Sequence, residues 1–326
     1  TGSAAVSKGS FAGAINVSLN YSKWMTKANL YDASILSGMD AELLARDDSK
    51  TVSIAAAAAW GAKYGLGGSF AFNSMKGTAE AAVSGSDLDL QRSLVLESSK
   101  NTQIVSAAGS YGGAEKFAFV ANVAVNDLDN KVVASLSNST VNANGDVQIE
   151  AFDTSRILSV SGAVAAYEGS GFGGAIALNQ LRQRVHAGSV DSEVASGGKI
   201  LLNSIADGEV LAFAVGVAGQ EIVGIGGSTA INRLDSVVDS HLNGGQFDAT
   251  TDVVVSAAST TLIESYTGGF AGAGKVAVGV AISLNEISAD VMARVTDSYV
   301  ATTTGVVRVS SKSSSKMQSL AVGGAG

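Results

Sequence analysis

The two histidines are the side chains best suited to acid–base or metal chemistry, because imidazole titrates near neutral pH and is a common metal ligand. They are His186 and His241, and the 326 residues contain no other histidine. They lie 55 positions apart, at nearly the same place in neighbouring copies of a 53-residue repeat. No column of carboxylates accompanies them, and cysteine is absent. A metal pair across neighbouring coils is the alternative, but the favoured interpretation is surface-exposed histidines, with no metal site and no cofactor.

Two glycine-rich segments superficially resemble phosphate-binding loops, in which backbone amides hold an anion at the start of a helix. They are Gly169–Gly174 and Gly224–Gly227. The residues that follow alternate in the manner of a strand, so the required helix is not expected. The nearest match to a calcium-binding repeat is formed by Gly244, Gly245 and Asp248, and it occurs only once. No arrangement of nucleophile, base and acid can be placed by spacing, so we expect no catalytic residues and no enzymatic activity.

One asparagine recurs every 53 positions, and such self-similarity is typical of repeat architectures. The members are Asn20, Asn73, Asn126, Asn179, Asn232 and Asn285. Each is expected to follow a strand and precede a turn. Asparagine tolerates the left-handed backbone of a corner, and its amide can bond the next amide along the axis. We predict a structural ladder.

The position before each asparagine is always large and apolar, which predicts a core column. Its members are Leu19, Phe72, Val125, Leu178, Ile231 and Leu284. Truncating one, for example Leu178→Ala, is expected to destabilise the fold by about 2–5 kcal/mol if the residue is buried.

The local period inside each unit is two, as in Val147–Ala151, and Gly, Asn, Asp and Ser separate short runs. This pattern predicts strands, and the complete absence of proline fits continuous β-pairing. The sequence therefore predicts an all-β, parallel β-helix of six 53-residue units. Five or six strands per unit suggest about two coils each, and the usual crossover chirality suggests a right-handed coil. Residues 1–326 are interpreted as a single fragment of a longer chain.

The net charge of −8 and the pI of about 4.8 argue against a nucleic-acid partner, which requires a basic surface. Membrane insertion of this segment is not expected either, because its apolar stretches are too short for a membrane helix. The expected partners are other copies of the chain or the rest of a longer chain, and a host or neighbouring-cell surface.

The segments Gly173–Leu181 and Ser189–Leu202 resemble the repeats of very large bacterial surface proteins. These are the leukotoxin-type filamentous adhesins, akin to filamentous haemagglutinin. The resemblance covers essentially the whole chain. It implies a secreted, β-helical shaft on a bacterial cell surface, with the binding ends elsewhere, and it carries over no catalytic residues.

The favoured function is therefore the structural shaft of an extracellular adhesin, which presents or spaces an adhesive tip. The alternative is a self-associating filament or sheath subunit, suggested by strands such as Phe70–Phe72 that are apolar or small on both faces. A polysaccharide-processing β-helix enzyme is disfavoured, because no loop interrupts the repeat through Asn285.

Overall fold

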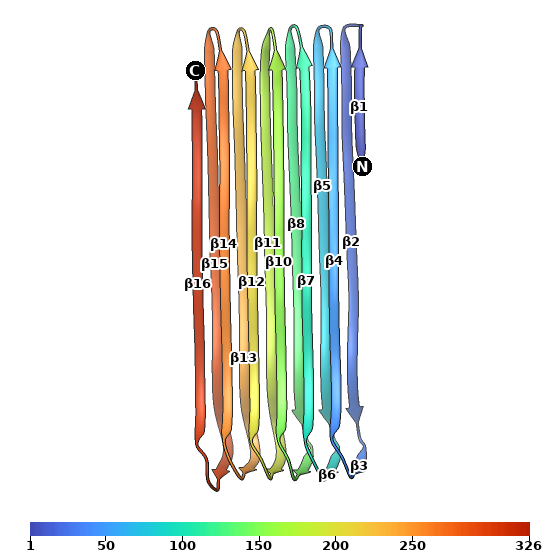
Figure 1. Cartoon of the computed structure of the whole chain (residues 1–326), viewed down its shortest axis with the longest axis vertical. Coiled ribbons are helices and arrows are strands. Elements are labelled where there is room, and N and C mark those ends of the chain that lie inside the picture. Colours follow the sequence, from blue (N-terminus) through green and yellow to red (C-terminus); the bar gives the residue numbers. More distant parts are fainter.

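The computed structural model describes the backbone of residues 1–326 and every side chain except that of residue 167. The chain is built from two parallel sheets (Figure 1). Sheet A contains β1 (Gly2–Ser7), β4 (Ala41–Gly61), β7 (Leu94–Ala114), β10 (Val147–Tyr167), β12 (Ile200–Gln220), β14 (Val253–Ala273) and β16 (Val307–Ala325). Sheet B contains β2 (Phe11–Tyr31), β5 (Tyr64–Ser84), β8 (Phe117–Ser137), β11 (Ser170–Ser196), β13 (Val223–Ala249) and β15 (Val276–Thr302), with the short β3 (Ser34–Ser37), β6 (Asp87–Leu90) and β9 (Thr140–Ala143).

The pairing register links each residue to the one 53 positions later. Asn126, for example, pairs with Asn179, and Val147 pairs with Ile200. Only the β1–β4 and β14–β16 pairs are offset by one further residue. The all-β, parallel solenoid-like fold is confirmed. The prediction of about two coils per unit is wrong, because a register of 53 makes each unit a single coil.

The strands are longer than the alternation suggested. Each full-length strand of sheet A from β4 to β14 has 21 residues, and β11, β13 and β15 have 27. Many Gly, Ser and Asn residues that resemble turn signals lie inside these strands, where they pair with the neighbouring strands on both sides. No proline interrupts the ladder. At about 3.3 Å per residue, a 21-residue strand spans about 70 Å.

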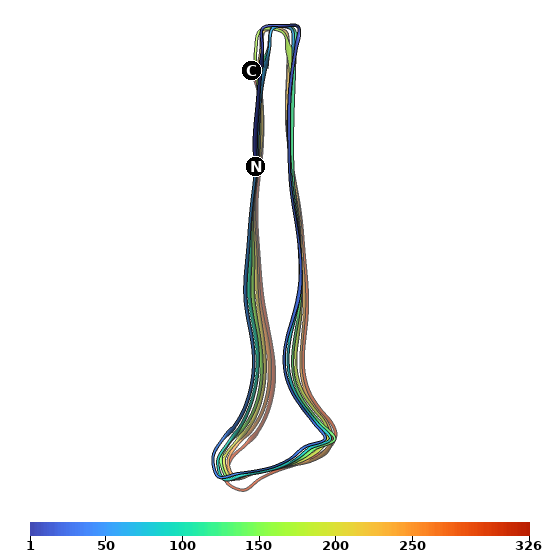
Figure 2. The same cartoon turned by 90° about the vertical axis from the view of Figure 1, so that its right-hand side faces the viewer.

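Each coil is narrow at one end and opens into a triangle at the other (Figure 2). At the narrow end the inward residues are mostly alanine and glycine, including a buried alanine cluster around Ala163, Ala177 and Ala212. A Cβ on Gly226 would overlap the carbonyl oxygen of Phe270 in the opposite layer. Only small residues therefore allow this close approach of the two sheets.

The triangular end holds the main hydrophobic core. Its residues are leucine, valine, isoleucine and alanine, with one buried phenylalanine, Phe247. Leu96, Ile149 and Leu202 come from successive coils and are fully buried, so large apolar side chains stack along the axis where the coil is wide enough. This arrangement is typical of solenoids, in which each coil buries its neighbours.

One corner of the triangle is formed by residues in the left-handed backbone conformation, which Gly, Asn and Asp adopt most readily. They recur every 53 positions: Asp32, Gly85, Asn138, Asp191, Gly244 and Asp297. This column, and not the asparagine column identified above, makes the corner.

Candidate functional site

The asparagine column lies in the middle of the sheet B strands and points inward. The Nδ2 of each asparagine donates to the Oδ1 of the next, at 2.7–2.8 Å, along Asn20, Asn73, Asn126, Asn179, Asn232 and Asn285. The inner members are buried. The expected position after a strand and before a turn is wrong, whereas the amide bonds run along the axis. The column therefore satisfies buried polar groups between the sheets.

The apolar column before each asparagine does not form the core. Leu19 is 66% exposed, Ile231 40% and Leu284 56%, while Phe72, Val125 and Leu178 are partly buried. Because side chains alternate along a strand, the inward asparagine turns its neighbour outward. The core prediction is wrong for Leu19, Phe72, Val125, Leu178, Ile231 and Leu284. The inward position is held by small residues such as Ala177, because the sheets are close together there.

Other outward residues of the same strands, nearer the narrow end, line an apolar groove on the outer face of sheet B, which is the candidate interaction site. Its floor is a column of small residues: Gly68, Ala121, Gly174 and Gly227. One wall is the column Leu66, Phe119, Phe172 and Ile225, and the other is Phe70, Val123, Ile176 and Thr229. Two hollows of about 200 and 260 Å³ lie within it.

The walls of the groove are ordered along the axis. Phe119 and Phe172 stack with ring centroids 5.1 Å apart. In the first and last coils, the larger residues Ile15 and Val280 stand at the register position of the floor and end the groove. Because it is lined by apolar side chains and has few polar groups, the groove can bury apolar side chains but offers no chemistry for bond breaking.

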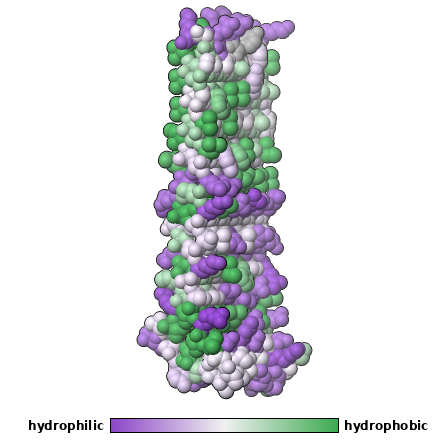
Figure 3. Space-filling model, turned by 60° about the vertical axis from the view of Figure 1, so that its left-hand side comes forward, coloured by the Kyte–Doolittle hydropathy of each residue, from purple (hydrophilic) through white to green (hydrophobic). Residues whose placement is uncertain are grey.

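Apolar surface is not confined to sheet B. On sheet A, Phe213 and Tyr266 stack at 5.1 Å and Val215 is 40% exposed. In a view turned toward the C-terminal coil, hydrophobic residues gather in the upper, narrow part of the molecule, above a hydrophilic band at mid-height (Figure 3). The narrow half of the coil therefore presents apolar side chains on the outer faces of both sheets.

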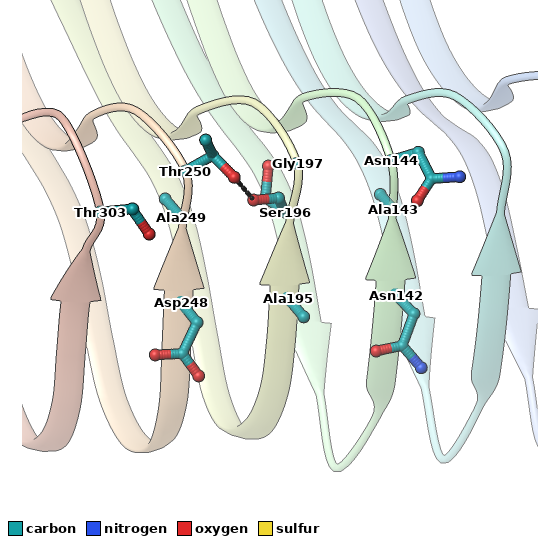
Figure 4. A pocket seen from close by; sticks show the side chains of 10 residues that line it. All are labelled: Asn142, Ala143, Asn144, Ala195, Ser196, Gly197, Asp248, Ala249, Thr250 and Thr303. Atoms are coloured by element: carbon teal, nitrogen blue, oxygen red, sulfur yellow. Dashed lines mark hydrogen bonds between the residues drawn. The ribbon is translucent and has the colours of Figure 1, made fainter.

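A polar hollow of about 370 Å³ lies on the short side of the triangle (Figure 4). It forms because Ala195 stands in one column between Asn142 and Asp248, and the smaller side chain leaves a gap between them. Thr250 bonds across the strands, with its Oγ1 3.4 Å from the carbonyl oxygen of Ser196. The hollow is open and lined by amide, carboxylate and hydroxyl groups, and so offers hydrogen bonds to a polar partner.

A buried ion pair crosses the coils inside the stack. The Nζ of Lys100 donates to the carboxylate of Asp47 in the neighbouring coil, which also accepts from the Nε1 of Trp24. A Cβ on Gly77 would collide with that Nζ, so glycine makes room for the lysine. Burial raises the pKa of Asp47, but hydrogen bonds from Lys100 and Ser49 outweigh it, so the pKa lies below its ordinary value.

Asp153 follows Lys100 in the same column, and no cation pairs with it among the described residues. Its Oδ1 accepts from the Nδ2 of Asn130 at 3.0 Å and from the Oγ of Ser155 at 2.8 Å. Its Oδ2 is buried, with no hydrogen-bond partner in the described part of the chain. Burial raises the pKa of Asp153 to about 6, against the lowering effect of those hydrogen bonds. The column therefore contains a carboxyl group that titrates in the mildly acidic range.

The expectation of exposed histidines without a carboxylate is wrong. His241 is 8% exposed, and both histidines contact Asp239, which is the register partner of His186 in the next coil. The contact with Asp239 follows from the 53-residue register, which places Asp239 beside His186. The 55-residue spacing of the two histidines indicated only that they lie near each other.

No protein-family model matches the chain, and no curated protein matches it. Among the described residues there is no helix with the length and hydropathy of a membrane span.

Proposed function

We propose that this chain is a structural shaft of a secreted bacterial cell-surface protein, which presents or spaces an adhesive tip. The observation that carries the proposal is the unbroken register: along sheet B, from β2 to β15, each long strand pairs with the next at an offset of 53 positions. A coil that contacts only its neighbours can be copied indefinitely without new kinds of contact. The resemblance to filamentous adhesins agrees with this role.

The six units and the right-handed sense belong to the same proposal. In Figure 2 the N-terminal coil is nearest, and the chain rises along sheet A and descends along sheet B as it recedes. That clockwise path supports a right-handed coil. The internal ladders, such as the asparagine amides, resist slippage of one coil on the next, because a shift would leave buried amides unpaired.

The dimensions favour a second function, a self-associating filament or sheath. Each coil uses 53 residues to advance about 4.8 Å along the axis, yet its strands are about 70 Å long. A spacer alone would reach further with shorter coils, so what the long coil adds is area on its two faces.

The partner that best fits those faces is a second copy of the chain. The groove and its walls repeat at the spacing of stacked strands, about 4.8 Å, and another such stack carries rows of side chains at the same spacing. Packed sheets interdigitate at about 10 Å, so a wall of one copy could enter the groove of another.

Electron microscopy of the native full-length protein tests both functions. The shaft predicts isolated flat ribbons with an axial spacing of about 4.8 Å that lead to a distinct tip. The sheath predicts ribbons stacked face to face. Compact particles, or coils in the interior of a folded enzyme, would contradict both.

A further inference from the structure

Three side chains that belong to neighbouring coils meet on the outer face of sheet B. The Oδ2 of Asp239 lies 2.8 Å from the Nδ1 of His241 and 3.3 Å from the Nδ1 of His186. The two imidazole rings are 4.7 Å apart between centroids. The candidate donor atoms of the three residues lie within 4.8 Å of one another. They stand shortly before the corner made by Asp191 and Gly244.

The carboxylate fixes which ring nitrogens are free. An ionised carboxylate only accepts hydrogen bonds, so each Nδ1 carries the proton and donates to Asp239. The Nε2 of each neutral ring then keeps its lone pair.

Both free nitrogens face the same small space. A Cβ built on Gly188 would lie 2.8 Å from the Nε2 of His186 and 3.0 Å from that of His241. Glycine therefore leaves a gap between two nitrogen lone pairs, where other coils carry Ala82 or Ser135 at the same register position. Nitrogen–metal bonds of 2.0–2.1 Å need only small ring movements to close on an ion in that gap.

We propose that His186 and His241 bind one transition-metal ion through their Nε2 atoms above Gly188, with Asp239 as the positioning residue for both rings. A carboxylate on the far nitrogen of a ligating histidine is the usual device that orients the ring and raises its basicity. The ion bridges β11 and β13, so it ties two neighbouring coils together along the axis.

The donor set selects the class of metal. Two imidazole nitrogens suit Zn²⁺, Cu²⁺ or Ni²⁺, whereas Ca²⁺ and Mg²⁺ require oxygen ligands. The charge of Asp239 is already shared with Arg294, whose Nη2 lies 3.1 Å from Oδ2. A single carboxylate supplies far fewer than the six to eight oxygens that Ca²⁺ takes, and water completes the coordination of the bound ion.

The test is metal titration of the full chain purified without a histidine tag. Calorimetry with Zn²⁺ gives stoichiometry and affinity, and electron paramagnetic resonance with Cu²⁺ reports the number of nitrogen ligands. We expect one ion per chain and two nitrogens. His186→Gln and Gly188→Ala should each weaken binding at least about tenfold, and Asp239→Asn about 10–100-fold.

Gly188→Ala is the sharpest variant, because it keeps all three side chains and only fills the gap. Alanine occupies this register position in β5, so the fold accommodates it, and Gly188→Ser repeats the test with the residue found in β8. Asp129→Asn, which alters a carboxylate paired with Arg184 on the same sheet, is the matched control and should bind as the natural chain does. Wild-type affinity in both Gly188 variants, or copper spectra without two nitrogens, would overturn the proposal.

Discussion

The Nδ2 of Asn126 donates to the Oδ1 of Asn179 at 2.8 Å, across 53 residues of sequence and one strand spacing of the stack. Asn179 in turn donates to Asn232, so each inner amide is both donor and acceptor. The bonds lie in the interior of the narrow half, where alternative partners are few. The ladder therefore ties the 53-residue period of the sequence to the 4.8 Å step of the fold.

Replacing one rung should destabilise the stack measurably. In Asn126→Leu the donor of Asn73 and the acceptor of Asn179 both lose their partner, and each buried unpaired group costs about 1–3 kcal/mol. We expect a clear fall in the free energy of unfolding by guanidinium denaturation. Asn142→Leu, at an exposed position, is the control and should change stability little. Equal stability of the two variants would show that the asparagine ladder does not stabilise the fold.

A pair of leucines on one strand tests which face is the core. Leu181 is fully buried, whereas Leu178, three residues earlier in β11, faces outward and is partly exposed. Leu181→Ala should destabilise by about 2–5 kcal/mol and Leu178→Ala by much less. The same denaturation experiment compares them directly. A larger loss for Leu178→Ala would restore the core column expected from the sequence.

The error over that column has a physical cause. Period-two alternation identifies two faces but not which one is inside, and here one face carries alanine while the other carries leucine, valine or isoleucine. Large apolar residues are normally assigned to the buried face. In this fold the two sheets are so close at the narrow end that only small residues fit between them, so Ala177 is inside and Leu178 outside.

Other features of the fold and the candidate site could be predicted from the sequence to different degrees. The 53-residue period, the strands and the amide bonds along the axis follow from the asparagine column alone. The corner column at Asp32, Gly85 and Asn138 is equally periodic, but Gly, Asn and Asp also occur inside strands here, so composition did not single it out. The sequence shows the glycines of the groove floor, Gly174 and Gly227. It does not show that they form a groove, because this depends on the bulky residues that strand pairing places on either side. The His–Asp cluster required the exact register.

Stability should fall as the pH rises through the range in which Asp153 titrates. Its pKa is raised from an unfolded value of 3.8 to about 6 in the folded chain. The folded state is therefore fully stabilised by this group below about pH 4 and loses that contribution as the pH rises through 6. At about 1.36 kcal/mol per pKa unit, the loss approaches about 3 kcal/mol.

Asp153→Asn should remove this pH dependence. We expect the variant to be more stable than the natural chain at pH 8 and similar at pH 4, as measured by denaturation at both values. Asp207→Asn, on the same sheet but exposed, is the matched control. A natural chain whose stability does not change between pH 4 and 8 would contradict a buried, unpaired carboxyl group at Asp153.

Filling the groove should prevent lateral association without disturbing the coil. A Cβ on Gly227 meets no atom within 4 Å, and valine occupies the same column at Val280. Gly227→Val should therefore fold normally but lower the association seen by sedimentation velocity at high concentration. Gly162→Val adds the same side chain on the outer side of sheet A, where there is also open space, and serves as the control. Unchanged association in Gly227→Val would exclude the groove as the contact.

The most direct test of one coil per 53 residues is a distance between spin labels. Asp48 and Thr260 are exposed on sheet A and are linked by four successive register steps, through Asn101, Thr154 and Asp207. The chain has no natural cysteine, so Asp48→Cys and Thr260→Cys can be labelled uniquely. Pulsed electron resonance should give a distance near 19 Å between the labelled positions, which is four steps of about 4.8 Å. A distance near 38 Å would mean two coils per unit and would contradict the fold on which the whole account rests.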